Sequence, residues 1–365
     1  MNRDIFRKNH ILLKSKDNLV FRYLKCAEEI VSEIKNDKDV LGVIVSGGVS
    51  RGYADRNSEI DIFIYLNGKG YERWQIEHNS PLPYGSSMRS GIPLHVIFEN
   101  YGTEAGEEWG DLKKWDRMLA KIMYDPHGKI RKLIDNKTRI SKLDLDQKAL
   151  HHLYNAWWYN FLAKIWILRN DLHSAQYIIN ESISETLKSI FFLNGTLYPH
   201  SKWMVYFAKH LSWLPESFDL IFETLKVDSF TSEAITTRSK QLRRIVKECI
   251  NYFLKDQPKY AYPIFWAHVE WINMFLSIYY NPGIKREELT KRQLNPLLLN
   301  QEPLYSLVKK KGKREYFVEK EQILAAWQKS SNLMMDLVRE ELNYLFKKLN
   351  NTQISNELSK YYKIK

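Results

Sequence analysis

The stretch "VIVSGGVSRGYADRNSEIDIFIYL", Val43–Leu66, is the part of this sequence that decides the fold. An aliphatic run ends at two adjacent glycines, and a second aliphatic run follows Glu59. Side chains alternate between the two faces of a strand, so Glu59 and Asp61 point to one face while the isoleucines point to the other. Two carboxylates about 6–7 Å apart along one face repel each other unless a cation lies between them. The stretch therefore predicts a buried strand, a glycine turn, and a second strand that presents two acids to a metal ion.

The glycine turn predicts an anion site. Gly47 and Gly48 directly follow the first strand, and glycine permits close backbone approaches that a Cβ forbids. Such a turn can bring its N–H groups against a phosphate, and Ser50 and Arg51 can add a hydroxyl and a positive charge. Mg²⁺ prefers carboxylates together with substrate phosphate oxygens. We therefore predict a nucleotide-binding turn that faces a site for Mg²⁺ or Mn²⁺.

The segment "GGVSRGYADRNSEIDIFI" resembles the signature of the polymerase-beta-like nucleotidyltransferase superfamily. That signature is a glycine followed by Gly or Ser, then Arg-Gly, then a strand with two acids separated by one hydrophobic residue. The residues that match it in order are Gly47, Gly48, Arg51, Gly52, Ser58, Glu59 and Asp61. The first acid of the family is usually Asp, and here it is Glu59. The resemblance implies transfer of a nucleoside monophosphate from a nucleoside triphosphate, with divalent metal held by the two acids.

The third carboxylate of this family lies on the next core strand, which the pattern predicts over residues 92–100. His95 stands at the matching position, with Glu99, out of phase, as a substitute. Histidine can ligate a divalent metal but suits Mg²⁺ poorly, and a hydrogen-bonded histidine near the core is the alternative to a ligand. The departure from the pattern leaves open a non-catalytic nucleotide-binding sensor or scaffold.

The fold class that we predict is α+β, with a small mixed-sheet nucleotidyltransferase domain (1–140) followed by an all-α helical domain (141–365). Before residue 140, strand patterns alternate with helical ones; beyond it they nearly disappear. The helices expected in the second part lie near 145–171, 173–195, 201–211, 215–226, 230–256, 262–280 and 319–349. The lysine-rich run at 308–316 is typical of a solvated loop or hairpin.

This two-domain layout is similar to that of antibiotic-modifying nucleotidyltransferases, the aminoglycoside and lincosamide enzymes among them. The resemblance implies adenylyl transfer to a hydroxyl of a small molecule, with the helical domain supplying the acceptor pocket and the general base. Glu181 and Glu185 share one helix face there and are the catalytic candidates; ion pairing with Lys188 is the alternative. Weaker polar candidates in this region are Arg169, Asp171, Asn180 and Lys202.

Composition limits the remaining classes. The formal net charge is +12, which suits an anionic substrate and leaves RNA as a possible acceptor. Nucleic acid is not favoured, because the basic residues are spread along the chain without a recognised binding module. No window of about 18 apolar residues is free of charges, so no membrane span is expected. The two cysteines and the charged N-terminus favour a reducing, cytoplasmic setting. A protein acceptor also remains open, and so does the choice between monomer and homodimer.

Overall fold

The computed structural model describes residues 18–256, 270–292, 294–300, 308–312 and 315–318, with the isolated positions 356, 359, 360 and 363. Backbone contacts group the described residues into two compact units. The first contains the described residues up to Lys148 and also Ile190–Trp213, and the second contains Ala149–Ser189 and the described residues from Leu214 onward. The first unit thus takes in a segment far beyond residue 140. The domain boundary at that residue stays a prediction.

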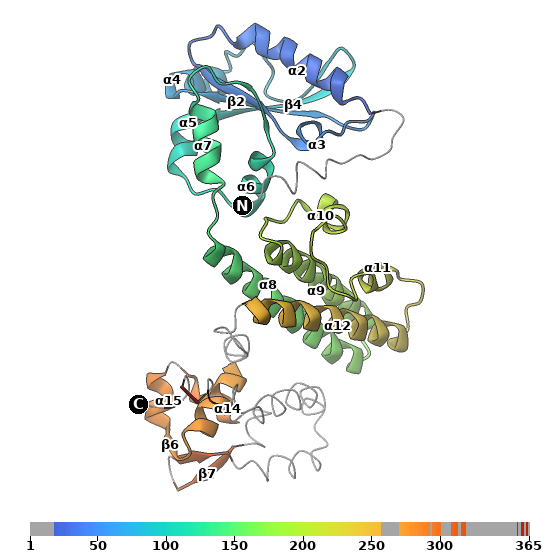
Figure 1. Cartoon of the computed structure of the whole chain (residues 1–365), viewed down its shortest axis with the longest axis vertical. Coiled ribbons are helices and arrows are strands. Elements are labelled where there is room, and N and C mark those ends of the chain that lie inside the picture. The colour runs from blue at the N-terminus through green and yellow to red at the C-terminus, as the bar shows by residue number, and fades with distance from the viewer. Residues whose placement is uncertain are drawn as a thin grey trace. The chain divides into compact units, whose positions relative to one another are not determined.

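The first unit is built on a five-stranded mixed sheet with the strand order β3-β4-β2-β1-β5, and Figure 1 labels its strands β2 and β4. The strands are β1 (Val40–Val45), β2 (Ile60–Leu66), β3 (Gly85–Arg89), β4 (Ile92–Asn100) and β5 (Lys121–Tyr124). β2 and β4 run parallel, whereas the other neighbours are antiparallel. The carboxylate strand β2 is therefore central, and its neighbours hold it on both sides.

The two faces of the sheet carry separate hydrophobic clusters. One cluster contains the even-numbered residues of β2 and packs with helix α2 (Val20–Ile34). The other contains Phe63 and Tyr65 together with Ile130 of helix α7 (Lys129–Lys137). Because Asp61 has the same parity as Phe63 and Tyr65, it shares their face. The alternation predicted for this strand is confirmed. The face that carries Phe63 and Tyr65 also carries Asp61.

The other described helices of the first unit are short. They are α3 (Gly47–Ser50), α4 (Gly68–Tyr71), the π-helix η1 (Glu72–Ile76), α5 (Tyr101–Gly106), α6 (Asp111–Met118) and α10 (Ser201–Ala208). α3 forms directly after β1, so the predicted glycine turn is the start of a single helical turn.

Helices dominate the remainder of the described chain. They are α8 (Lys142–Leu168), α9 (Leu172–Leu193), α11 (Leu220–Leu225), α12 (Ser232–Asp256), α14 (Glu270–Tyr280), α15 (Arg286–Lys291) and the 3₁₀-helix η3 (Pro296–Asn300). The predicted fold class, a mixed sheet followed by a helical region, is confirmed. The predicted helix at 319–349 lies outside the described residues.

One feature of the second unit differs from the prediction. A small sheet with the order β6-β8-β7 joins β6 (Ile284–Lys285), β7 (Lys309–Lys311) and β8 (Glu315–Phe317). β7 and β8 lie in the lysine-rich run that the sequence predicts as a loop or a hairpin, and they pair antiparallel. Each strand is too short to produce a readable alternation. The described part of the helical region is thus not purely α. None of the described helices combines the length and the hydropathy needed to cross a bilayer.

Candidate active site

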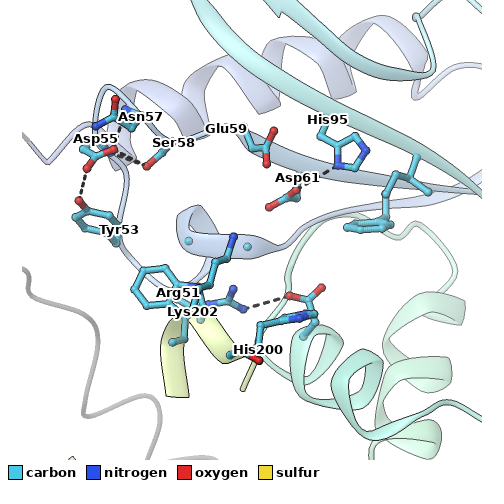
Figure 2. Close-up of a pocket in the computed structure, with 17 residues that line it drawn as sticks. Arg51, Tyr53, Asp55, Asn57, Ser58, Glu59, Asp61, His95, His200 and Lys202 are labelled. Atoms are coloured by element: carbon cyan, nitrogen blue, oxygen red, sulfur yellow. Dashed lines mark hydrogen bonds and ion pairs between the residues drawn. The ribbon is translucent and has the colours of Figure 1, made fainter. Parts of the chain in front are cut away.

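A pocket of about 800 Å³ opens on the first unit, within the size range of small-molecule sites. Its lining comes from α3, from the loop that joins α3 to β2, from β2 and β4, from α6 and from α10. Figure 2 shows these side chains converging from elements that are far apart in the sequence. The pocket includes both acids of the carboxylate strand, both glycines of the turn, and His95.

Asp61 lies directly against the glycine turn. A Cβ added to Gly47 would lie 1.9 Å from Oδ2 of Asp61, and the backbone of Gly47 has a φ of +66°. Only glycine combines that conformation with that approach. The backbone N–H of Ser46 also donates to the carbonyl oxygen of Asp61 at 2.9 Å. The turn therefore faces the carboxylate as the sequence predicts, and the fit between them is tight.

The charge of Asp61 is poorly compensated. Burial raises the pKa of its carboxyl, and the nearby carboxylates of Glu59 and Asp116 raise it further, while His95 and Lys202 act in the opposite direction. The side chain is 26% exposed, whereas Glu59, just before β2, is exposed. Ionised Asp61 is thus held at an energetic cost, in a place where a cation would relieve it.

The loop that carries Glu59 is organised by Asp55. Its carboxylate accepts hydrogen bonds from the Asn57 backbone N–H (2.8 Å), from the Ser58 hydroxyl (3.0 Å) and from the Tyr53 hydroxyl. These bonds lower the pKa of Asp55, the one from Tyr53 most strongly. Ser58, a signature position, therefore fixes the loop rather than serving as a ligand in this geometry.

His95 is the neighbour of Asp61 across the parallel pair β2–β4. Nδ1 of the imidazole lies 3.6 Å from Oδ1 of Asp61, and the side chain is 39% exposed. Figure 2 shows the two side by side at the same edge of the pocket. The same register places Glu99 on the His95 face, opposite Tyr65. The expectation that Glu99 is out of phase is therefore wrong.

Glu99 nevertheless does not line the pocket. It pairs with Arg117 (3.2 Å) and with Lys113 (3.8 Å), and burial raises the pKa of its carboxyl. Its carboxylate is engaged by these two cationic side chains. It is not a substitute for the missing third acid at the pocket.

Arg51 lines the pocket, but its side chain and that of Ser50 are both engaged within the fold. Arg51 is 6% exposed, its Nη1 lies 3.3 Å from Oδ1 of Asp116, and its guanidinium stacks 4.4 Å from the ring centroid of Trp115. The Ser50 hydroxyl donates to the carbonyl oxygen of Gly47 at 3.0 Å, and Ser50 does not line the pocket. Ser50 stabilises the turn through this hydrogen bond, and Arg51 stabilises it through its contacts with Asp116 and Trp115.

Asp116, on α6, was not found from the sequence. It accepts hydrogen bonds from the Ser46 hydroxyl (2.6 Å) and from Arg117 (2.7 Å), in addition to its contact with Arg51. Burial alone would raise its pKa, but the two arginines and Ser46 outweigh burial, and the pKa is lowered. An aspartate within "DLKKWDRM" carries no signal of this role. Only the packing of α6 against the turn reveals it.

A segment distant in sequence completes the pocket. His200, Ser201, Lys202 and Trp203 line it from the start of α10. Aromatic contacts hold this segment in place: Trp115 meets His200 and Phe207, with centroids 6.0 and 5.8 Å apart, and Trp203 meets Tyr53 edge-on at 6.4 Å. Lys202 is exposed, and within the described residues it is assigned no hydrogen bond or ion pair. It extends into the pocket in Figure 2.

Glu181 and Glu185, the catalytic candidates, lie on α9 in the second unit. Glu185 is buried, and its carboxylate contacts His152 Nδ1 (2.7 Å), Lys188 Nζ (2.6 Å) and Asn155 Nδ2 (3.1 Å). Burial raises its pKa, but these partners outweigh burial and lower the pKa to about 2. Glu181 is half-buried. Their catalytic role stays a prediction.

The donor set at the pocket suits a cation that completes its coordination with substrate. Among the residues that the structure describes, no three His, Cys, Asp or Glu side chains form a ready-made metal cage. Glu59, Asp61 and His95 nevertheless line one pocket, and Asp61 carries a charge that burial makes costly. Mg²⁺-type sites in nucleotide enzymes use one or two carboxylates together with phosphate oxygens. The residues present fit such an ion.

Comparison with known proteins agrees with this geometry. Residues 25–140 match the family model described as "Nucleotidyltransferase domain". That range contains all five strands of the mixed sheet and ends well before α10. Among solved structures, a nucleotidyltransferase-like protein from Exiguobacterium sibiricum 255-15 matches with 9% identity and a TM-score of 0.38, over 80% of this chain and 98% of that one. At that score the likeness adds nothing to the argument. No curated protein matches the sequence.

Proposed function

We propose, from the nucleotidyltransferase domain that residues 25–140 form, that this protein moves AMP from ATP to a hydroxyl of a small-molecule acceptor, with Mg²⁺ or Mn²⁺. Nucleotidyl transfer in general follows from the domain; the donor, the metal and the acceptor are the proposal. The observation that carries it is the partly buried Asp61 carboxylate, which lies against Gly47 and whose charge His95 and Lys202 compensate only in part, since its pKa stays raised.

Glu59, Asp61 and His95 are the residues that would hold the metal. When bound, the ion would neutralise charge on the phosphates and on the departing pyrophosphate. The protein's own contribution is to fix Asp61 by the β2 register and by the turn at Gly47, and to fix Glu59 through the loop that Asp55 organises. These contacts position the acids before any substrate arrives.

Lys202 is the residue best suited to the triphosphate. It lines the same pocket as the glycine turn and is close enough to Asp61 to lower the pKa of that carboxyl. A lysine ammonium binds phosphate as a mobile point charge. In this proposal Arg51 does not bind the phosphates directly, because its guanidinium already contacts Asp116 and Trp115. We therefore propose that Lys202, rather than Arg51, supplies the positive charge that binds the triphosphate.

In the proposed reaction, the acceptor hydroxyl oxygen forms a bond to the α-phosphorus, while the bond from that phosphorus to the bridging oxygen breaks. Pyrophosphate leaves with the bonding electrons, and the hydroxyl proton passes to a base. Glu181 and Glu185 are the proposed bases. A carboxylate with a pKa of about 2 has little affinity for a proton, so Glu181 is the better candidate of the two.

The acceptor class comes from the resemblance to antibiotic-modifying enzymes, so hydroxylated antibiotics of the aminoglycoside and lincosamide types are the first acceptors to test. His95, at the place of a carboxylate, favours one second candidate: a sensor or scaffold that binds nucleotide without turnover. Transfer to a protein or an RNA end is a third outcome, and a steep salt dependence of binding would distinguish RNA.

The test is release of pyrophosphate by the full chain with ATP, GTP, CTP or UTP, over pools of small-molecule acceptors, with Mg²⁺, Mn²⁺ or EDTA. We expect turnover with ATP, no turnover with EDTA, and none in Asp61→Asn. Calorimetry of ATP binding accompanies it, with Glu59→Gln and Asp61→Asn. Binding without turnover by any acceptor identifies the sensor. Unchanged nucleotide binding in both variants overturns the assignment.

A further inference from the structure

His95 distinguishes this pocket from a site made of oxygen ligands alone. It stands on β4 directly across from Asp61 of β2 in a parallel ladder of seven paired positions. Cross-strand register fixes both Cβ atoms, so the imidazole is held beside the carboxylate by the sheet itself. Its place does not depend on a flexible loop.

The separation of the two side chains is unlike that of a hydrogen bond. Nδ1 of His95 and Oδ1 of Asp61 are 3.6 Å apart, beyond the usual range of about 2.7–3.2 Å for a nitrogen–oxygen hydrogen bond. Two ligand atoms on one ion, each bonded at about 2.1 Å, lie about 3.0 to 3.5 Å apart for right-angled to tetrahedral arrangements. The observed gap is slightly wider than this range, so a small approach of the two side chains would place both atoms on one ion.

A purely structural role explains His95 less well. The side chain is 39% exposed and lines the pocket. Within the residues that the structure describes, its ring nitrogens make no hydrogen bond, and Asp61 is its one ion-pair partner. A histidine kept for packing is normally buried and bonded through a ring nitrogen.

We propose that His95 sets the metal preference of this site, so that it selects nitrogen-accepting divalent ions, with Mn²⁺ as the representative, over Mg²⁺. The inference rests on the proposed function, because it concerns the metal of that same pocket. Mg²⁺ is a hard ion that demands oxygen ligands and gives up water reluctantly. Imidazole suits Fe²⁺, Ni²⁺, Cu²⁺ and Zn²⁺ best, and Mn²⁺, although it shares the preference of Mg²⁺ for oxygen, accepts a nitrogen ligand more readily than Mg²⁺ does. One histidine in place of one carboxylate therefore removes an oxygen ligand from Mg²⁺ and offers Mn²⁺ a nitrogen.

The other charged groups at the pocket do not discriminate between these ions. Glu59 and Asp61 offer oxygen to both, and Lys202 repels both. Asp116 is already engaged by Ser46, Arg51 and Arg117. His95 is the pocket residue whose donor atom differs in kind and which also lies beside Asp61. The ratio of the Mn²⁺ affinity to the Mg²⁺ affinity isolates the contribution of His95, because a change in the net charge of the pocket alters both affinities alike and cancels in the ratio.

The experiment measures Mn²⁺ binding to the full chain by the loss of the free-ion EPR signal, alone and with a non-hydrolysable ATP analogue, and then displaces Mn²⁺ with Mg²⁺. His95→Asp and His95→Asn are compared with wild type. His200→Asn is the matched control, because His200 lines the same pocket from α10. Circular dichroism and thermal unfolding verify that each variant is folded.

We expect the preference for Mn²⁺ over Mg²⁺ to fall by at least about tenfold in both His95 variants, since even loss of an outer-shell partner of a metal ligand costs 10- to 100-fold. His200→Asn should leave the preference unchanged. Wild-type protein with bound Mn²⁺ should show nitrogen-14 modulation in pulsed EPR, and the His95 variants should lose it.

Two failures are distinguishable. An unchanged preference in folded His95→Asp, with no nitrogen-14 modulation in wild type, overturns this inference while metal and nucleotide still bind, and leaves the proposed function in place. Wild-type protein that binds neither ion, alone or with the ATP analogue, overturns the proposed function and this inference together.

Discussion

Asp61 and Glu185 are two acids, one in each compact unit, that the fold treats in opposite ways. Glu185 is buried and receives three side-chain partners, and its pKa falls to about 2. Asp61 is about one quarter exposed, it lies beside other carboxylates, and its pKa is raised. The protein supplies partners that balance the charge of Glu185 and balances that of Asp61 only in part.

We interpret this difference as one between an acid that stabilises the fold and an acid that is kept for a ligand. A carboxylate that the protein itself neutralises stabilises the fold and has little left for a substrate. A carboxylate held ionised against burial and like charge destabilises the free protein and gains when a cation arrives. To recognise an acid that binds a ligand, it is therefore more informative to ask whether the protein already balances its charge than to ask whether polar residues lie near it.

The largest effect is expected at the contact that holds Asp61. In Gly47→Ala the new Cβ would lie 1.9 Å from the Asp61 carboxylate, at a φ of +66°. The carboxylate has to move, and a misplacement of about 1 Å can cost about a hundredfold in rate. We expect at least that loss in steady-state nucleotidyl transfer.

Gly48→Ala is the matched control for this change. Its Cβ would lie 3.0 Å from the carbonyl oxygen of Tyr53, without a positive φ, so a small shift of the loop relieves it and a smaller loss is expected. If Gly47→Ala works at the wild-type rate, Asp61 is not positioned by the turn, and the contrast with Glu185 loses its basis.

The next effect is on stability, at the other acid. Glu185→Gln should lower the free energy of unfolding of the second unit by on the order of 2–3 kcal/mol at pH 7, since the carboxyl pKa drops from about 4.3 to about 2 on folding. A lowered pKa means that this stabilisation is complete above about pH 4.5 and is lost as the pH falls toward 2. Urea unfolding at several pH values measures it.

The same variant tests the catalytic alternative. If Glu185→Gln is as stable as wild type but loses nucleotidyl transfer, Glu185 is a general base and belongs with the functional acids. Glu181→Gln, prepared in parallel, should show the reverse pattern, with a larger effect on kcat than on unfolding.

The smallest effect concerns Lys202. In Lys202→Met, KM for ATP should rise by about tenfold with little change in kcat, because a single charge–phosphate contact that is also present in the ground state is worth about 1–2 kcal/mol. Lys209→Met, just past the end of α10, should leave KM unchanged. Equal effects in the two variants would indicate that the general positive charge of the chain, rather than a built site, attracts the nucleotide.

Much of the first unit could be predicted from the sequence. The glycine pair, the alternation of β2 and the separation of Glu59 and Asp61 are local patterns, and each reflects backbone geometry directly. The family match over residues 25–140 and the confirmed mixed sheet agree with them. His95 was also located correctly on the neighbouring strand, because strand alternation constrains it.

The residues that were missed depend on packing between distant segments. Asp116 was missed, and Lys202 was only a weaker candidate. Both line the pocket because α6 contacts the turn and because the α10 segment packs through Trp115, Trp203 and Tyr53. Neither segment has a periodic pattern that reports this. Arg51 was expected at the phosphates for its charge, and that role stays a prediction: its guanidinium is buried and paired with Asp116. Charge type can be read from a sequence, whereas charge compensation requires the fold.

The central claim is that Asp61 is kept ionised at a cost for the benefit of a bound cation and nucleotide. Thermal unfolding of wild type and Asp61→Asn, each with and without ATP and divalent metal, tests it most directly. Because the folded-state pKa of Asp61 is raised, the neutral amide should make the free protein more stable than wild type, while the ligands should raise Tm in wild type only. A variant that is less stable than wild type and still gains stability from the ligands would contradict the account.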